Sequence, residues 1–113
     1  MGYGPGEGHK DALAAVAAIN AHYHAAPHHA ATLTLASADG VSKVLRMVCA
    51  PGDHVLADEF TFTPLALAAE AHGARWVPVR MDAGGLVPEE LERILEGWDK
   101  RRGRRPHVLF NVP

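Results

Sequence analysis

The sequence contains a single cysteine, and this scarcity is the first constraint on the class of protein. Cys49 has no second cysteine with which to form an internal disulfide, so a small secreted scaffold held together by disulfides is excluded. Cys49 also ends an apolar stretch, residues 44–49, where a buried and inert thiol is expected. We therefore expect a protein of a reducing compartment, the cytoplasm.

Long apolar runs and an excess of one charge are also missing. No run approaches the roughly 20 apolar residues that span a bilayer, and the first residues lack the basic and apolar regions of a secretion signal. A formal charge of -2 gives no general attraction to nucleic acid or anionic lipid. The basic run 100–105 contains no interleaved aromatic residue, so we interpret it as a solvated helix end or loop. We expect neither a membrane nor a nucleic-acid partner.

The composition that is present is that of one globular domain, or part of one. The 113 residues are 48% hydrophobic and 21% charged, which suits a packed core and not a disordered chain. The length is too short for two domains of ordinary depth.

Helical and strand patterns alternate along the chain. They predict helices at 11–23, 41–48, 64–72 and 88–98, and strands at 31–36, 54–57, 75–79 and 107–112. Four strands separated by helices predict an α/β fold with a mostly parallel sheet. Pro78 cannot donate a hydrogen bond to a neighbouring strand, so the strand at 75–79 is expected at a sheet edge or with a bulge.

The turn after the first predicted strand is a candidate anion site. In residues 36–40, Ala-Ser-Ala-Asp-Gly, small side chains would let backbone N–H groups at a helix N-terminus approach a phosphate, and Ser37 adds a hydroxyl donor. The alternative is that Ser37 or Asp39 only caps the helix. The residues alone favour the cap.

Two acidic and two aromatic residues follow the second predicted strand. Asp58 and Glu59 would lie at the ligand-binding edge of the sheet, where a carboxyl group could act as a general acid or base. Phe60 and Phe62 lie in the loop beyond. Either ring could fill the gap between the sheet and a helix, or lie against a planar ligand.

The histidine cluster near the first helix end does not predict a metal site. His22, His24, His28 and His29 are close in sequence, but a structural zinc site usually includes cysteines or a second ligand pair, and Cys49 is alone. Solvent-exposed helix-end histidines are the simpler interpretation, and we expect no metal ligand.

Five segments, in this order and spacing, resemble a known family. They are residues 3–8, 36–43, 51–59, 82–91 and 108–113. Together they resemble the class I/II aminotransferases of fold type I, and among these the aromatic-amino-acid, kynurenine and 2-aminoadipate aminotransferases, particularly fungal ones. The resemblance covers nearly the whole chain. It implies a pyridoxal-5′-phosphate-dependent transferase of amino acid metabolism that moves an amino group between an amino acid and a 2-oxo acid, and a homodimer.

The resemblance also assigns cofactor-binding positions. Ser37 and Ala38 match the positions that bind the cofactor phosphate, and Phe62 matches an aromatic residue stacked on the pyridine ring. Tyr3 matches a tyrosine that reaches the phosphate of the neighbouring subunit. Ala38 stands where many relatives have a polar side chain, often glutamine, and Phe62 keeps the stacking face of the usual tyrosine without its hydroxyl.

By the same resemblance, residues 1–113 form the N-terminal part of the large, cofactor-binding domain, without the lysine that forms the Schiff base. Lys10, Lys43 and Lys100 are expected to be solvated surface lysines, so we predict no catalytic residue in this chain. The chain alone should not transaminate, and unpaired sheet edges should make it marginally stable. Two alternatives are a non-catalytic truncated remnant or interaction module, and a small flavodoxin-like domain that binds a phosphorylated ligand at the same turn.

Overall fold

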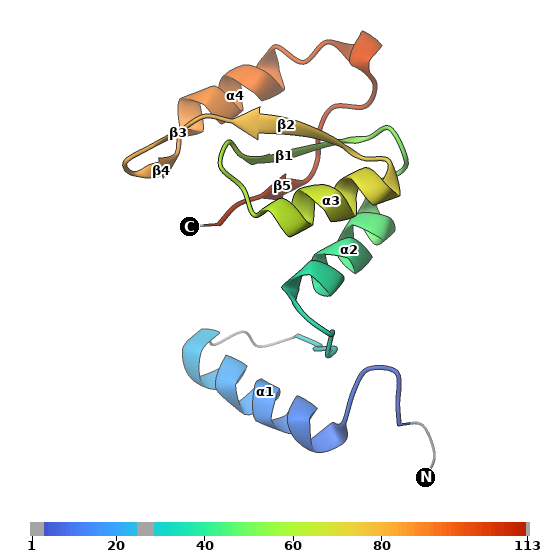
Figure 1. Ribbon diagram of the computed structural model, residues 1–113. Helices are drawn as coiled ribbons and strands as arrows, with labels where there is room; N and C mark the ends of the chain where they lie inside the picture. The colour runs from blue at the N-terminus through green and yellow to red at the C-terminus, as the bar shows by residue number, and fades with distance from the viewer. Residues whose placement is uncertain (1–3, 25–28, 113) are drawn as a thin grey trace. The chain divides into compact units, whose positions relative to one another are not determined.

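The computed structural model describes residues 4–24 and 29–112 of the chain (Figure 1). Contacts between residues divide the chain into two compact units, residues 1–37 and 38–113. The first unit contains one helix, and the second contains the sheet and the remaining helices.

The first unit is built around α1, which spans Lys10–His24 and confirms the helix predicted at 11–23. Asp11 in its first turn and His22 and His24 in its last turn suit the helix dipole. None of its residues is buried. The helix therefore owes more to its alanine-rich sequence than to packing within this unit.

The strand predicted at 31–36 is wrong. The Leu33 N–H donates to the Glu7 carbonyl at 2.8 Å, and the Thr32 hydroxyl donates to the same carbonyl at 3.2 Å. One backbone hydrogen bond is not a ladder, and the described residues of this unit provide no neighbouring strand. Gly8, at φ +122°, lies so close to Leu33 that a Cβ atom would meet its side chain at 2.7 Å. The segment thus folds back on a glycine turn instead of entering a sheet.

The second unit has a three-stranded parallel sheet. Its order is β2-β1-β5, with β1 at His54–Asp58, β2 at Arg75–Val79 and β5 at Leu109–Phe110. All five residues of β1 are buried, as expected for the central strand. Pro78 lies in the edge strand β2, which confirms its predicted position. β5 is shorter than the strand predicted at 107–112.

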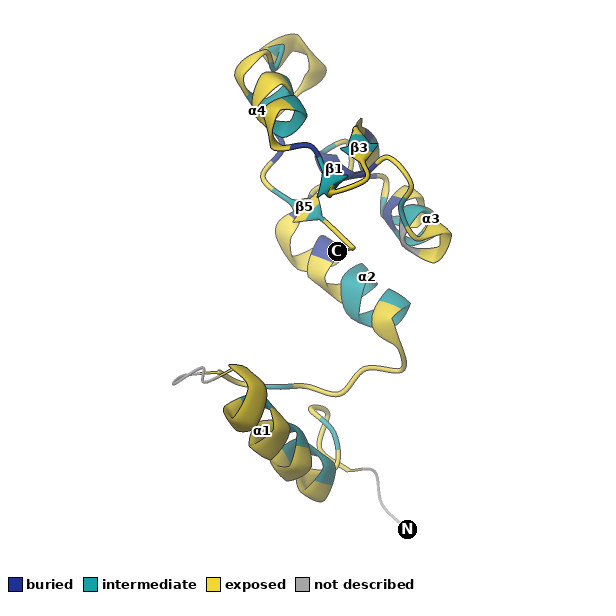
Figure 2. Cartoon of the chain, turned by 90° about the vertical axis from the view of Figure 1, so that its left-hand side faces the viewer, coloured by how far each residue is buried: buried dark blue, intermediate teal, exposed yellow. Residues whose placement is uncertain are grey.

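Helices cover both faces of this sheet (Figure 2). On one side Val55 packs with α2, which spans Ser37–Val48, and with α3, which spans Thr63–His72. On the other side Leu56 packs with residues of β2 and with α4, which spans Pro88–Glu96. Successive residues of β1 therefore serve opposite cores, as the two-residue period of a strand requires. The α/β class with a parallel sheet is confirmed.

Short elements complete the second unit. The predicted turn at 82–85 is the turn of an antiparallel hairpin between β3, Met81–Asp82, and β4, Gly85–Leu86. The basic run contains a 3-10 turn, η1, at Lys100–Arg102. Among the described residues no helix combines the length and the apolar character that crossing a membrane requires.

A buried histidine lies where β1 meets α4 and the basic run. His54 is 4% exposed, and its Nδ1 atom has no hydrogen-bond partner among the described residues. Its ring meets the Trp98 ring edge to face at 4.8 Å, and the Arg102 guanidinium lies 4.5 Å above Trp98. Burial, followed by the charges of Arg102 and Arg75, lowers the pKa of His54, and Asp53 opposes this shift. Near neutral pH the imidazole is therefore uncharged.

Candidate functional site

The N-terminus of α2 has the properties of an anion site. Ser37 and Ala38 are its first two residues, Ser37 is exposed and Ala38 is half-buried. The first backbone N–H groups of a helix have no partner within the helix, and they lie at the positive end of its dipole. Asp39, in the first turn, is paired with Lys43 one turn later, which offsets the negative charge that would otherwise oppose an anion.

Phe62 stands at the start of α3, four residues after the carboxyl end of β1. It occupies the N-cap position of α3 in extended backbone, and Pro64 follows in the first turn. Its side chain is 49% exposed, and that of Phe60 is 81% exposed. A half-exposed ring offers a face to a planar ligand. The alternative that these rings fill a gap inside the fold does not suit Phe60.

Asp58 has a structural role. It is 2% exposed, and its two carboxylate oxygens accept hydrogen bonds from Asn111 Nδ2 at 2.8 Å and from the Val112 N–H at 2.6 Å. Both oxygens are thus committed to the segment after β5. The neighbouring Glu59 is exposed, and its Oε2 atom lies 3.4 Å from the Met81 N–H. Of the pair proposed for acid or base chemistry, only Glu59 faces solvent.

A pocket of about 400 Å³ lies between the β3–β4 hairpin and the residues after β5. Gly84, Gly85 and Leu86 line it from the hairpin, and Leu109, Asn111 and Val112 line it from the other side. β3 follows β2 directly, and Asn111 follows β5, so the pocket borders the carboxyl ends of the parallel strands. Ligands of open α/β sheets bind at this edge.

The remaining predicted positions are a tyrosine and three lysines. Tyr3 lies outside the described residues. Lys10, Lys43 and Lys100 are all exposed, in agreement with their interpretation as surface lysines.

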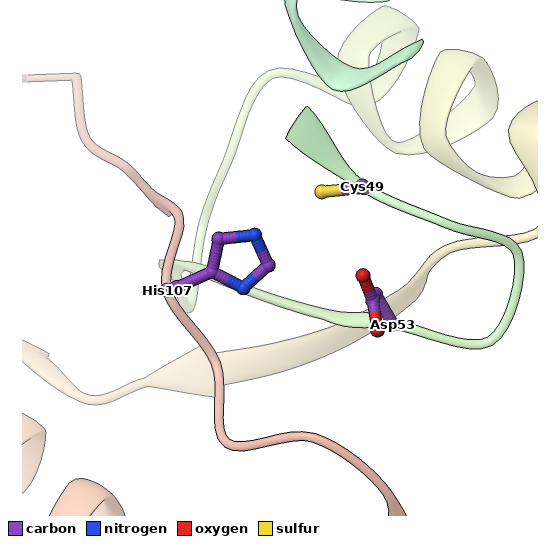
Figure 3. A group of neighbouring side chains, drawn as sticks. All are labelled: Cys49, Asp53 and His107. Atoms are coloured by element: carbon purple, nitrogen blue, oxygen red, sulfur yellow. The ribbon is translucent and has the colours of Figure 1, made fainter. Parts of the chain in front are cut away.

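Sequence reasoning missed one cluster, formed by Cys49, Asp53 and His107 (Figure 3). One potential ligand atom from each residue lies within 4.8 Å of the others. Burial, and next the Asp53 carboxylate, raise the pKa of the Cys49 thiol, while Arg104 opposes this shift. The spacing of Cys49 and Asp53 around a Pro-Gly turn was visible in the sequence. His107 is distant in the chain, and only the fold brings it to them.

Comparison with known proteins places these features in a family. The sequence profile described as "Aminotransferase class I and II" matches residues 1–113. An L-tyrosine:2-oxoglutarate aminotransferase of Tapinella panuoides is 48% identical over 112 residues, which are 98% of this chain and 21% of the relative. An aromatic amino acid aminotransferase of Schizosaccharomyces pombe is 43% identical over 74 residues, 66% of this chain and 15% of the relative.

Solved structures show the same fold. The aminotransferase Aro8 of Candida albicans matches 97% of this chain and 23% of its own with a TM-score of 0.87 and 28% identity. A kynurenine aminotransferase of Pyrococcus horikoshii matches the fold with a TM-score of 0.89 at 20% identity, over 100% of this chain and 28% of its own. The matched residues span 21% of the first curated relative and 15% of the second. The matches in sequence profile and in fold exclude the flavodoxin-like alternative. The chain belongs to the class I and II aminotransferase family.

Proposed function

We propose that this chain supplies the front part of the cofactor-binding domain of a pyridoxal-phosphate-dependent aminotransferase. The substrates would be an aromatic or related amino acid and a 2-oxo acid. The family match over residues 1–113 carries the proposal. The fungal relatives named for tyrosine and aromatic amino acids support the choice of substrate class.

The start of α2 would hold the phosphate of the cofactor. The backbone N–H groups at Ser37 and Ala38, in the first turn of the helix, and the Ser37 hydroxyl are donors, and a phosphate dianion needs donors near positive charge. Ala38 adds no side-chain donor, so binding at that position would depend on backbone alone. A helix cap is the alternative role of Ser37, and the experiment below distinguishes the two roles.

Phe62 would support the pyridine ring. Its half-exposed side chain has an aromatic face but no hydroxyl, so stacking is its whole contribution. A homodimer, with Tyr3 reaching the phosphate of the neighbouring subunit, belongs to the same proposal. So does a cytoplasmic location, which the single free thiol of Cys49 suits.

When bound, pyridoxal phosphate supplies the electron sink for amino-group transfer, and the protein supplies binding and orientation. The residues of this chain would bind and orient. Since Lys10, Lys43 and Lys100 are exposed, we expect the 113-residue chain to show no transamination by itself. Cofactor-dependent turnover by the purified chain would contradict this assignment. A non-catalytic remnant that keeps the fold is the second candidate, and the coding sequence beyond Pro113 distinguishes the two, because an active parent must encode a buried lysine.

The phosphate site can be tested with pyridoxamine 5′-phosphate, which has no aldehyde and so cannot condense with surface lysines. Its fluorescence anisotropy should rise on binding. Ala38→Asp should weaken binding at least about tenfold, because a carboxylate then faces the phosphate at close range, and Ser37→Ala should weaken it less. Ser42→Ala, in the same helix but beyond its first turn, is the matched control and should bind like the wild type. Equal binding by Ala38→Asp and Ser42→Ala would contradict the proposed phosphate site.

A further inference from the structure

The turn between α2 and β1 holds Cys49 and Asp53 in fixed positions. The Ala50 N–H donates to Asp53 Oδ2 at 2.9 Å, and the Asp53 N–H donates to the Ala50 carbonyl at 3.0 Å. Gly52, at φ +92°, donates its N–H to the Gly73 carbonyl at 2.7 Å. Hydrogen bonds within the turn and to the residue after α3 therefore fix its backbone. They hold Cys49 and Asp53, at the two ends of the turn, close together.

His107, which lies just before β5, is tied to the start of the same turn. Its Nε2 atom lies 2.8 Å from the Val48 carbonyl, immediately before Cys49. If Nε2 donates this hydrogen bond, Nδ1 is unprotonated and has a lone pair that can bind a metal ion. Hydrogen bonds of this kind, from an imidazole to a backbone carbonyl, orient histidine ligands in metal sites.

We propose that Cys49, Asp53 and His107 form a binding site for a divalent cation of the zinc class. A thiolate, an imidazole and a carboxylate are the ligand types that zinc accepts, and three protein ligands leave a fourth position for water. The three ligand atoms already lie within 4.8 Å of one another. Binding would replace the thiol proton of Cys49, which passes to the solvent, by a sulfur–metal bond.

The surroundings decide the character of the site. Cys49 is 7% exposed, whereas His107 is exposed, so a cation can enter from the His107 side and meet the sulfur inside. Arg104 acts on Cys49 with a positive charge, which opposes a cation. The carboxylate of Asp53 offsets that charge. The site is separate from the start of α2 and from Phe62.

Cobalt(II) is the probe that tests this site, because a thiolate bound to it gives an intense charge-transfer absorption and Cys49 is the only thiol. The reduced, chelator-treated 113-residue chain should develop that absorption on titration with Co²⁺, and zinc should abolish it by displacement. Cys49→Ser should remove the absorption. His107→Gln and Asp53→Asn should lower the cobalt affinity at least about tenfold, as loss of a ligand or of its orientation does.

Surface histidines could bind metal weakly by themselves, so the matched control removes two of them. His22 and His24 are exposed on α1, and the double variant H22Q/H24Q should keep the charge-transfer absorption at wild-type affinity. Circular dichroism would verify that each variant folds. His107→Gln is the variant least expected to disturb folding, because the His107 side chain is exposed. The proposal is overturned if the wild type shows no charge-transfer absorption, or if His107→Gln binds cobalt as the wild type does.

Discussion

Replacing Asp58 by alanine should detach β5 from the sheet. β5 pairs with β1 through only two residue pairs, Leu56 with Leu109 and Ala57 with Phe110. The carboxylate of Asp58 adds the two hydrogen bonds that hold the residues after β5. Because so few other bonds join this strand to the sheet, its position should depend strongly on one buried side chain.

The size of the effect follows from the two bonds. A hydrogen bond to a charged group contributes about 1.5–3 kcal/mol, and a donor left without a partner adds a desolvation cost. Asp58→Ala should therefore lower the free energy of unfolding of the second unit by about 3 kcal/mol or more. Asn111→Ala removes one bond and should cost about half of that. Asp58→Asn keeps an acceptor for the Val112 N–H and should lie between the wild type and Asp58→Ala.

Urea unfolding followed by tryptophan fluorescence measures this effect, because both tryptophans, Trp76 and Trp98, lie in the second unit. Asp82→Ala is the matched control. The Asp82 carboxylate also accepts a backbone N–H, from Gly84 at 2.7 Å, but it is exposed. Its loss should have a much smaller effect. If Asp58→Ala destabilises the unit no more than Asp82→Ala, burial of the Asp58 carboxylate does not have the structural role assigned to it.

Three further perturbations test the second unit. Burial is the main cause that lowers the pKa of His54 below 6.5. The stability that depends on this group is therefore present above about pH 6.5 and is lost as pH falls through the lower pKa of the folded state. The urea midpoint should decrease over that pH range, and it should decrease less in His54→Phe. Gly73→Ala should destabilise the unit by about 1 kcal/mol, because Gly73 has φ +82° and a Cβ would lie 3.2 Å from Pro51; an unchanged thermal midpoint would contradict this. Arg102→Ala should alter the fluorescence of Trp98, over whose ring it lies, and should cost only about 0.5 kcal/mol.

Local patterns predicted the helices and the strands β1 and β2 because the relevant signals are local. The apolar run of β1 and the proline in β2 carry their own signatures, and the structure confirms both. The strand predicted at 31–36 failed for a different reason. Its alternating Thr-Leu-Thr-Leu pattern is a strand signal, but a strand exists only where a neighbour supplies hydrogen bonds. No such neighbour occurs among the described residues.

The residues of the candidate sites also differ in how far the sequence could predict them. The helix start at Ser37, to which the proposed phosphate position belongs, was visible because small residues and a cap candidate precede the apolar pattern of α2. The role of Asp58 was not, since it depends on Asn111 and Val112, which are more than 50 residues away. The Cys49, Asp53 and His107 cluster was missed for that reason too. Contacts between distant parts of a chain leave no periodic signal in the sequence.

A crystal structure of the complete protein with pyridoxal phosphate would test the central claim most directly. We expect the phosphate oxygens within about 3 Å of backbone N–H groups at Ser37 and Ala38, and the pyridine ring lying against the face of Phe62. A phosphate bound elsewhere, with the N-terminus of α2 in contact only with its own cap or with solvent, would contradict the account.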